Sequence, residues 1–102
     1  MPIPPTAGRI VLYTLSTQDA ELINSRRMQA AAHTTHAEGA QLHLGNTVAA
    51  GEVYPLVITR VWGAEVTSSV NGQLLLDGND THWVTSVNQG TGPRTWAWPV
   101  KF

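Results

Sequence analysis

The chain has 102 residues, a net charge of −1 and only 13% charged residues, whereas about 25% is usual for a soluble domain. It contains no cysteine, which excludes disulfides, thiolate zinc sites and cysteine nucleophiles. We expect one domain, residues 1–102, with no membrane span and no secretory signal. So few charges make nucleic-acid binding an unfavoured function.

The first predicted elements are a strand and a helix. The segment Arg9–Leu15 is rich in β-branched and aromatic residues, which is typical of a strand. Ser16 and Asp19 then form a variant of the capping box, and strong helix formers follow, so we predict a helix from Thr17 to about Ala31. Its inward stripe is thin, and we expect it to pack on the edge or end of a sheet. The stripe consists of Ala20, Ile23, Arg27 and Ala30.

The next segment, AHTTHAEGAQ, breaks the helical pattern, and we predict a loop that is the most mobile part of the chain. It contains His33 and His36 in an H-x-x-H pattern. That spacing suits a metal on a helix with a third ligand nearby, and the sequence indicates neither. We therefore favour a solvated loop and predict no metal site.

The rest of the chain predicts short strands separated by tight turns. They comprise a short strand before the Gly45-Asn46 turn, a long strand over Val53–Trp62, a hairpin, and a last strand in TWAWPVKF. Pro55 should lie near a strand start or on an edge. Asn71-Gly72 suits either a turn or a strand start with a glycine bulge. We predict a mainly β (α+β) fold, a small SH3-like barrel of five to six antiparallel strands, with one helix inserted after the first strand.

One turn in the hairpin has an unusual density of polar groups. Asp77, Gly78, Asn79 and Asp80 lie between two apolar runs, and turn chemistry accounts for all four residues. The alternatives are a metal clamp or acid–base pair made by the two carboxylates, or a hairpin tip that hydrogen-bonds a sugar or base edge beside an indole. We favour the structural turn and expect Asp80→Ala to cost about 1 kcal/mol of stability.

Tryptophan is the strongest compositional signal, with four in the chain. So small a core cannot easily hold them all, and we expect one or two to be half exposed as contact surface. Arg60 and Trp62 share a strand face and can stack, while Arg94 lies in a loop just before Trp96. We predict one aromatic and basic ligand-binding pocket, in which Trp83 and Arg94 carry the binding. Its predicted residues are Arg60, Trp62, His82, Trp83, Arg94 and Trp96.

Catalytic motifs are missing from the sequence. There is no G-x-S-x-G, no phosphate-binding glycine loop, and Lys101 is the sole lysine. We therefore predict a protein that is not an enzyme and that needs no cofactor.

Three segments carry a resemblance to a known family: GRIVLYTLSTQDAELINSRR, GNTVAAGEVYPLVITRVWG and VNGQLLLDGNDTHWVTSVNQGTGPRTWAWP. They resemble small uncharacterised proteins of tailed phages that infect actinobacteria. The resemblance implies a phage origin, in the host cytoplasm during infection or on the virion, and it assigns no catalytic residue.

These observations favour a phage accessory protein that binds without catalysis. It would sequester a nucleotide-like host signal or a host defence protein; the alternative is a virion structural component, such as a capsid decoration or head–tail accessory protein. We also expect a homo-oligomer, because a thinly charged chain with four tryptophans should expose an apolar patch.

Overall fold

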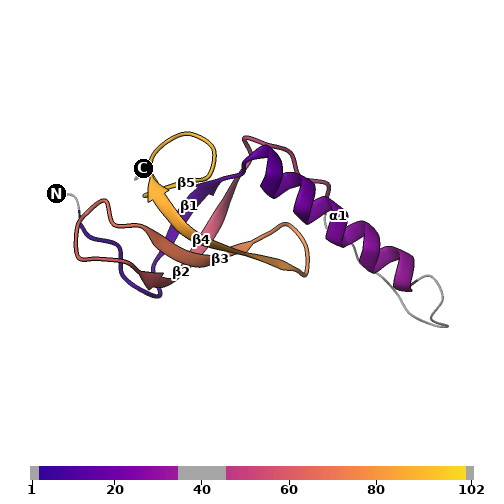
Figure 1. Ribbon diagram of the computed structural model, residues 1–102, viewed down its shortest axis with the longest axis horizontal. Coiled ribbons are helices and arrows are strands. Elements are labelled where there is room, and N and C mark those ends of the chain that lie inside the picture. The colour runs from indigo at the N-terminus through magenta and orange to yellow at the C-terminus, as the bar shows by residue number, and fades with distance from the viewer. Residues whose placement is uncertain (1–2, 35–45, 101–102) are drawn as a thin grey trace.

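The computed structural model describes residues 3–34 and 46–100, in which five strands close into a barrel. In chain order the elements are β1 (Ile10–Thr14), α1 (Thr17–Thr34), β2 (Val53–Val61), β3 (Val70–Leu75), β4 (Thr81–Gln89) and β5 (Thr95–Ala97). The strands follow one another around the barrel in sequence order, and α1 is inserted between β1 and β2 (Figure 1). This confirms the mainly β, SH3-like barrel with a helix after the first strand.

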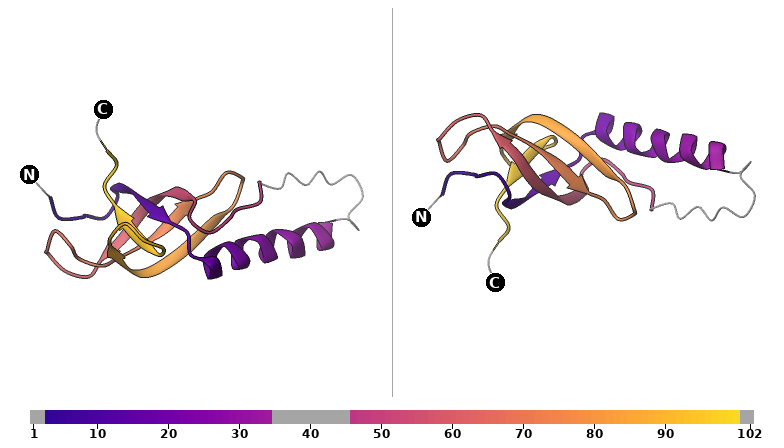
Figure 2. Two further views of the ribbon diagram at one scale, coloured as in Figure 1. Left: turned by 90° about the horizontal axis from the view of Figure 1, so that it is seen from above. Right: turned by 90° about the horizontal axis from the view of Figure 1, so that it is seen from below.

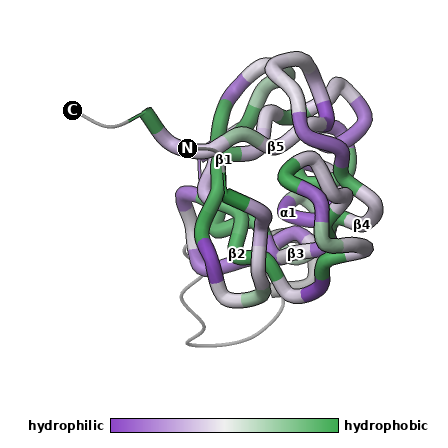
Figure 3. The backbone as a smooth tube through the Cα atoms, turned by 90° about the vertical axis from the view of Figure 1, so that its left-hand side faces the viewer, coloured by the Kyte–Doolittle hydropathy of each residue, from purple (hydrophilic) through white to green (hydrophobic). Residues whose placement is uncertain are grey.

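The direction of the strands differs from the prediction at one interface. Viewed from the end opposite α1, the five strands form a ring (Figure 3). β1 is antiparallel to both β2 and β5. A ring with an odd number of strands cannot alternate direction at every interface, so one pair must be parallel. That pair is β4–β5, where Asn88 lies opposite Thr95 and Gln89 opposite Trp96.

The helix begins where the sequence predicts and continues further. The backbone N–H of Ser16 donates to Oδ2 of Asp19 at 3.0 Å, and the N–H of Asp19 donates to Oγ of Ser16 at 3.1 Å, which is a reciprocal capping box. The helix runs to Thr34 rather than Ala31, so the backbone of His33 is helical. His36, the rest of the predicted loop and the short strand before Gly45 lie outside the described residues.

The barrel core is apolar and receives side chains from all five strands. Fully or almost fully buried residues include Val11, Tyr13, Leu56, Ile58, Leu74, Val87 and Trp96. Pro55, the third residue of β2, lies opposite Leu12 near the start of that strand, as expected.

Asn71 and Gly72, which the sequence assigned either to a turn or to a strand start with a bulge, both lie within strand β3. A Cβ on Gly72 would lie 2.4 Å from the carbonyl oxygen of Val57 and 2.6 Å from Cδ1 of Leu56. Glycine is therefore required by close strand packing and not by a turn. The bulges lie on the neighbouring strands: the extra residue is Thr59 in β2, and β4 carries another opposite Asn71.

Helix α1 starts at one end of the barrel and projects beyond it (Figures 1 and 2). Three residues of the predicted stripe, Ala20, Ile23 and Arg27, are buried, whereas Ala30 is exposed. Among the described residues, no helix has the length and apolar content to cross a membrane.

Candidate functional site: a pocket between α1, β4 and Arg94

The turn from Asp77 to Asp80 connects β3 to β4 and also ties the barrel to α1. Arg27 donates from Nε to Oδ2 of Asp80 at 2.8 Å and from Nη2 to Oδ1 at 2.9 Å. Its Nη1 donates to the carbonyl oxygen of Asn46. Asn46 in turn donates from Nδ2 to Oδ2 of Asp77 at 2.5 Å. Both carboxylates are therefore engaged in holding the chain together, which supports the structural interpretation of this turn.

Electrostatics at this turn agrees with the geometry. The hydrogen bonds from Arg27 lower the pKa of Asp80, and the same contact raises the pKa of Arg27. The Arg27 side chain is only 7% exposed, so its charge depends on Asp80 for compensation. Within residues 3–34 and 46–100, no group of three or more His, Asp or Glu side chains is placed to hold a metal ion.

A second polar cluster joins the start of α1 to β1 and β4. Tyr13 donates to Oδ2 of Asp19 at 2.5 Å, and Nε2 of His82 lies 3.4 Å from Oδ1 of Asp19. On the other side of the imidazole, Nη2 of Arg26 lies 2.7 Å from Nδ1. Because a guanidinium can only donate, Nδ1 accepts and the ring proton is on Nε2, toward Asp19. His82 is thus a neutral link between two helix residues.

The protonation states in this cluster follow from burial and hydrogen bonding. Burial, then the charge of Arg26, lowers the pKa of His82. Burial acts to raise the pKa of Asp19, but hydrogen bonds from Tyr13, Ser16 and His82 outweigh it and hold the pKa below its ordinary value. Burial and the bond to Asp19 raise the pKa of Tyr13. At neutral pH the cluster contains a carboxylate, a neutral phenol and a neutral imidazole.

A pocket of about 270 Å³ opens beside this cluster. One wall comes from the first turns of α1 and another from β4, and the turn before β5 supplies an arginine. The lining residues are Gln18, Asp19, Leu22, His82, Trp83, Val84, Thr85 and Arg94. Trp83 is 59% exposed and Leu22 is also exposed, so the pocket combines apolar surface with polar groups, as ligand sites commonly do.

The backbone is strained on two sides of this pocket. Among the described residues, Ser86 and Arg94 are the only non-glycine residues with positive φ, at 53° and 61°. The N–H of Ser86 donates to Oδ1 of Asn71 at 2.8 Å, and the N–H of Arg94 donates to the carbonyl oxygen of Thr14 at 2.8 Å. Such conformations persist where surrounding contacts hold them, and they gather at functional sites. Here the hydrogen bonds of Ser86 and Arg94 hold the backbone next to Thr85 and at Arg94, two residues that line the pocket.

The residues that line the pocket carry one negative and one positive charge. Asp19 contributes a carboxylate, Arg94 lines the pocket, and Arg26 lies just behind His82. The Arg94 guanidinium makes one hydrogen bond, from Nη2 to the Thr85 carbonyl oxygen at 3.3 Å, and forms no ion pair within the described part of the chain. It is therefore available to an anionic ligand.

The structure divides the predicted pocket into three parts. It brings His82, Trp83 and Arg94 together. It confirms the Arg60–Trp62 stack, with Cζ of Arg60 4.0 Å from the ring centroid, but this stack is not among the residues that line the pocket.

Trp96 was wrongly placed at the site. It is completely buried, donates from Nε1 to the Ser68 carbonyl oxygen at 3.2 Å, and meets Trp98 edge to face at 5.7 Å. As the middle residue of β5, Trp96 points its side chain into the barrel core, where it stabilises the fold.

Sequence reasoning missed the helix wall of the pocket. Asp19 was assigned only to the capping box, and Gln18 and Leu22 were not singled out. A usable signal was present, because Leu22 is an apolar residue outside the predicted inward stripe of the helix.

Comparison of the chain with protein-family models, with curated proteins and with solved structures finds no match.

Proposed function

We propose that this protein is a phage accessory protein that binds a nucleotide-like ligand in the pocket beside Trp83 and Arg94, without catalysis. One observation carries the proposal: an exposed indole and an arginine without an ion pair in the described chain line the same pocket. An indole provides a stacking face for a base, and a guanidinium binds phosphate with paired hydrogen bonds. The pocket volume of about 270 Å³ lies near the lower end of the range for small-molecule sites.

The state of the acid and base groups supports binding without catalysis. His82 has both ring nitrogens engaged, by Arg26 and by Asp19. Asp19 already accepts hydrogen bonds from Tyr13 and Ser16. A general base needs a free lone pair directed at its substrate and sufficient basicity. His82 lacks the free lone pair, and the lowered pKa of Asp19 makes its carboxylate a weak base.

The biological role of such binding follows from the phage resemblance. In an infected actinobacterial cell, a small protein with this pocket would withdraw a nucleotide-like host signal from its receptor. The protein would then act in the host cytoplasm during infection, and it would release the ligand unchanged.

Isothermal titration calorimetry with AMP, GMP, CMP and UMP tests the proposal, with the matching nucleosides as controls for the phosphate. We expect at least one nucleotide to bind and its nucleoside to bind about tenfold more weakly or worse, because the charged hydrogen bonds to Arg94 are lost. Trp83→Ala and Arg94→Ala should abolish the heat. Trp62→Ala is the matched control, since it removes an exposed indole outside the pocket. Absence of heat with all four nucleotides would reject the nucleotide-like ligand.

A virion structural component is the second candidate. It is favoured by apolar residues that are exposed outside the pocket, among them Ile10, Val53 and Trp62, since such surface is commonly covered by another chain. Mass spectrometry of purified virions decides between the two roles. A stoichiometric presence in virions supports the structural role, and its absence supports the accessory role.

A further inference from the structure

The exposed indole of Trp62 is held in one orientation. Trp62 is 51% exposed and follows directly after β2. Its Nε1 donates to Oδ1 of Asn71 at 2.9 Å, its backbone N–H donates to the Ser69 carbonyl oxygen at 2.9 Å, and Arg60 covers one face of the ring. Asn71 is buried and also holds Ser86. A rigid exposed aromatic loses little freedom on binding, which is typical of a contact residue at an interface.

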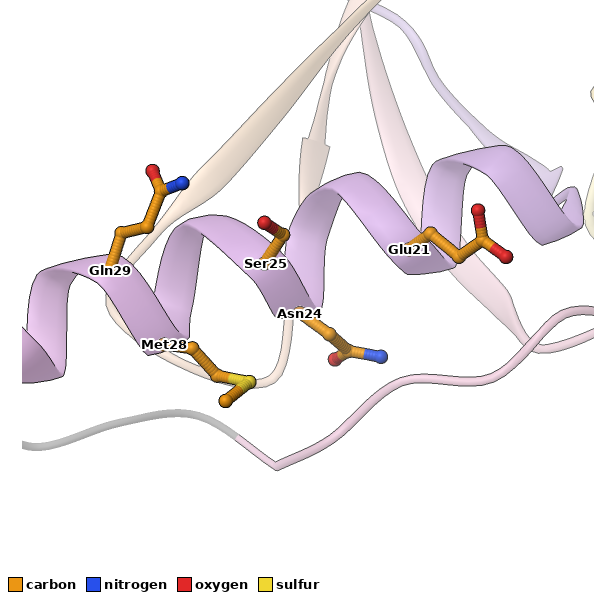
Figure 4. A pocket seen from close by; sticks show the side chains of 5 residues that line it. All are labelled: Glu21, Asn24, Ser25, Met28 and Gln29. Atoms are coloured by element: carbon orange, nitrogen blue, oxygen red, sulfur yellow. The ribbon is translucent and has the colours of Figure 1, made fainter.

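A hollow of about 520 Å³ lies along α1, and its described lining belongs to one helix face. The lining residues are Glu21, Asn24, Ser25, Met28 and Gln29. Met28 is 74% exposed and Glu21 is also exposed. Figure 4 shows Asn24 and Met28 pointing to the same side of the helix. Asn24 is engaged with the backbone of Val48, so the wall of the hollow is fixed near its middle.

The two features carry opposite charges and side chains that pack well together. One is a projecting indole with a guanidinium stacked on it, and the other is a hollow with an exposed thioether and a carboxylate. A methionine sulfur packs favourably against an aromatic ring. Arg60 and Glu21 have opposite charges, and neither forms an ion pair within the described residues. Opposite charges at the edge of an apolar contact orient it more than they strengthen it.

The two features lie at opposite ends of the molecule. The β2–β3 connection, in which Trp62 is the first residue, is at the end of the barrel away from α1 (Figures 1 and 2). One molecule therefore cannot bring its own Trp62 to its own hollow. Two different patches that fit each other produce a head-to-tail contact, which closes into a ring or continues as a chain.

We propose that copies of this protein associate head to tail, with Trp62 and Arg60 of one copy seated against Met28 and Glu21 of the next. The interface is separate from the pocket beside Trp83 and does not depend on the proposed ligand. The partner that covers this weakly charged surface is a second copy of this chain.

Sedimentation velocity over a range from micromolar to submillimolar protein tests the proposal. We expect the weight-average sedimentation coefficient of the wild type to rise with concentration. Trp62→Ala and Met28→Lys should each weaken association about tenfold or more, as truncation of a central interface residue does. Trp83→Ala is the matched control with an equally exposed indole, and it should associate like the wild type. Circular dichroism establishes that each variant is folded.

An equimolar mixture of the Trp62→Ala and Met28→Lys proteins distinguishes head-to-tail contact from a symmetric one. The first variant retains an intact hollow and the second an intact indole, so together they form one wild-type interface and should stop at a dimer. A wild type that remains monomeric throughout would overturn the proposal. So would undiminished association in both single variants, or a mixture that fails to dimerise.

Discussion

The barrel interior is closed by apolar side chains from every strand, whereas the contact between α1 and the barrel combines the buried apolar residues Ala20 and Ile23 with polar and charged side chains. We call the polar part of this contact the helix seam; it consists of the Arg27–Asp80 pair and the cluster of Tyr13, Asp19, His82 and Arg26. Apolar burial is nondirectional and insensitive to pH, while the seam requires particular atoms in particular charge states. The barrel should therefore be the more robust of the two regions, and the seam should respond to pH.

The largest expected effect on stability is the difference between replacing a tryptophan in the barrel core and replacing one at the surface. Trp96→Ala opens a cavity in the barrel and should lower the free energy of unfolding by about 3–5 kcal/mol, enough to unfold a marginal domain. Trp83→Ala removes a mostly exposed indole and should change it by less than about 0.5 kcal/mol. Urea denaturation followed by circular dichroism measures both, and equal effects would mean that the two indoles are not differently buried.

The next effect tests whether the helix seam depends on charge pairing. Asp80→Ala leaves the buried Arg27 guanidinium without its carboxylate and should cost about 2–3 kcal/mol, more than the 1 kcal/mol expected of a simple turn residue. The double variant Arg27→Met with Asp80→Ala removes both charges, and the methionine keeps apolar volume in place. It should be more stable than Asp80→Ala alone in urea denaturation. A double variant that is less stable than Asp80→Ala would show that Arg27 stabilises the fold through more than its ion pair with Asp80.

These two regions also mark what the sequence could and could not predict. Strand content, the capping box at Ser16 and the turn at Asp77–Asp80 depend on local chemistry, and all were predictable. The parallel β4–β5 pair follows from the number of strands in a closed ring, which a local pattern does not contain. Arg27 appeared on the inward stripe of the helix without an explanation, because its partner lies 53 residues away in the chain.

The candidate site was only partly predictable, for a related reason. Trp83, His82 and Arg94 were identified by residue type, but types alone do not separate an outward indole from an inward one. Alternation along β4 turns Trp83 outward between the inward His82 and Val84, and it is interrupted only beyond Val84, at the bulge before Val87. The helix wall made by Gln18 and Leu22 depends on the position of α1 against the barrel, which local pattern does not specify.

A smaller effect concerns pH. The pKa of His82 is lower in the folded protein than its ordinary value, so the unfolded chain binds a proton more readily. Stability is therefore fully present above about pH 6.5 and should fall as the pH decreases, by at most about 1.4 kcal/mol per pH unit for one proton. Nearer pH 4, protonation of Asp19 and Asp80, whose pKa values are also lowered, should weaken the seam further.

His82→Gln provides the control for the pH effect. The loss of stability between about pH 6.5 and pH 5 should disappear in this variant, because glutamine has no group that takes up a proton in this pH range. Thermal unfolding in a series of buffers measures the slope. An unchanged slope in His82→Gln would assign the pH dependence to other groups.

The smallest expected effect is that of a chelator. Within the described residues no group of three or more metal-binding side chains lies together, and Asp77 and Asp80 are engaged by Asn46 and Arg27. EDTA should leave the thermal midpoint unchanged. A decrease of several degrees would instead identify a bound metal ion that contributes to stability.

The division of labour between the turn and the pocket is tested most directly by calorimetric titration of a binding nucleotide into Asp80→Ala and Arg94→Ala, with the thermal midpoint of each variant measured on the same sample. We predict that Arg94→Ala loses binding and keeps a midpoint close to that of the wild type, because the guanidinium makes one long hydrogen bond to the part of the chain that the structure describes. Asp80→Ala should keep binding at temperatures where it remains folded and should have a clearly lower midpoint. If Asp80→Ala abolished binding while its midpoint stayed unchanged, the turn would be the binding site and this account would be contradicted.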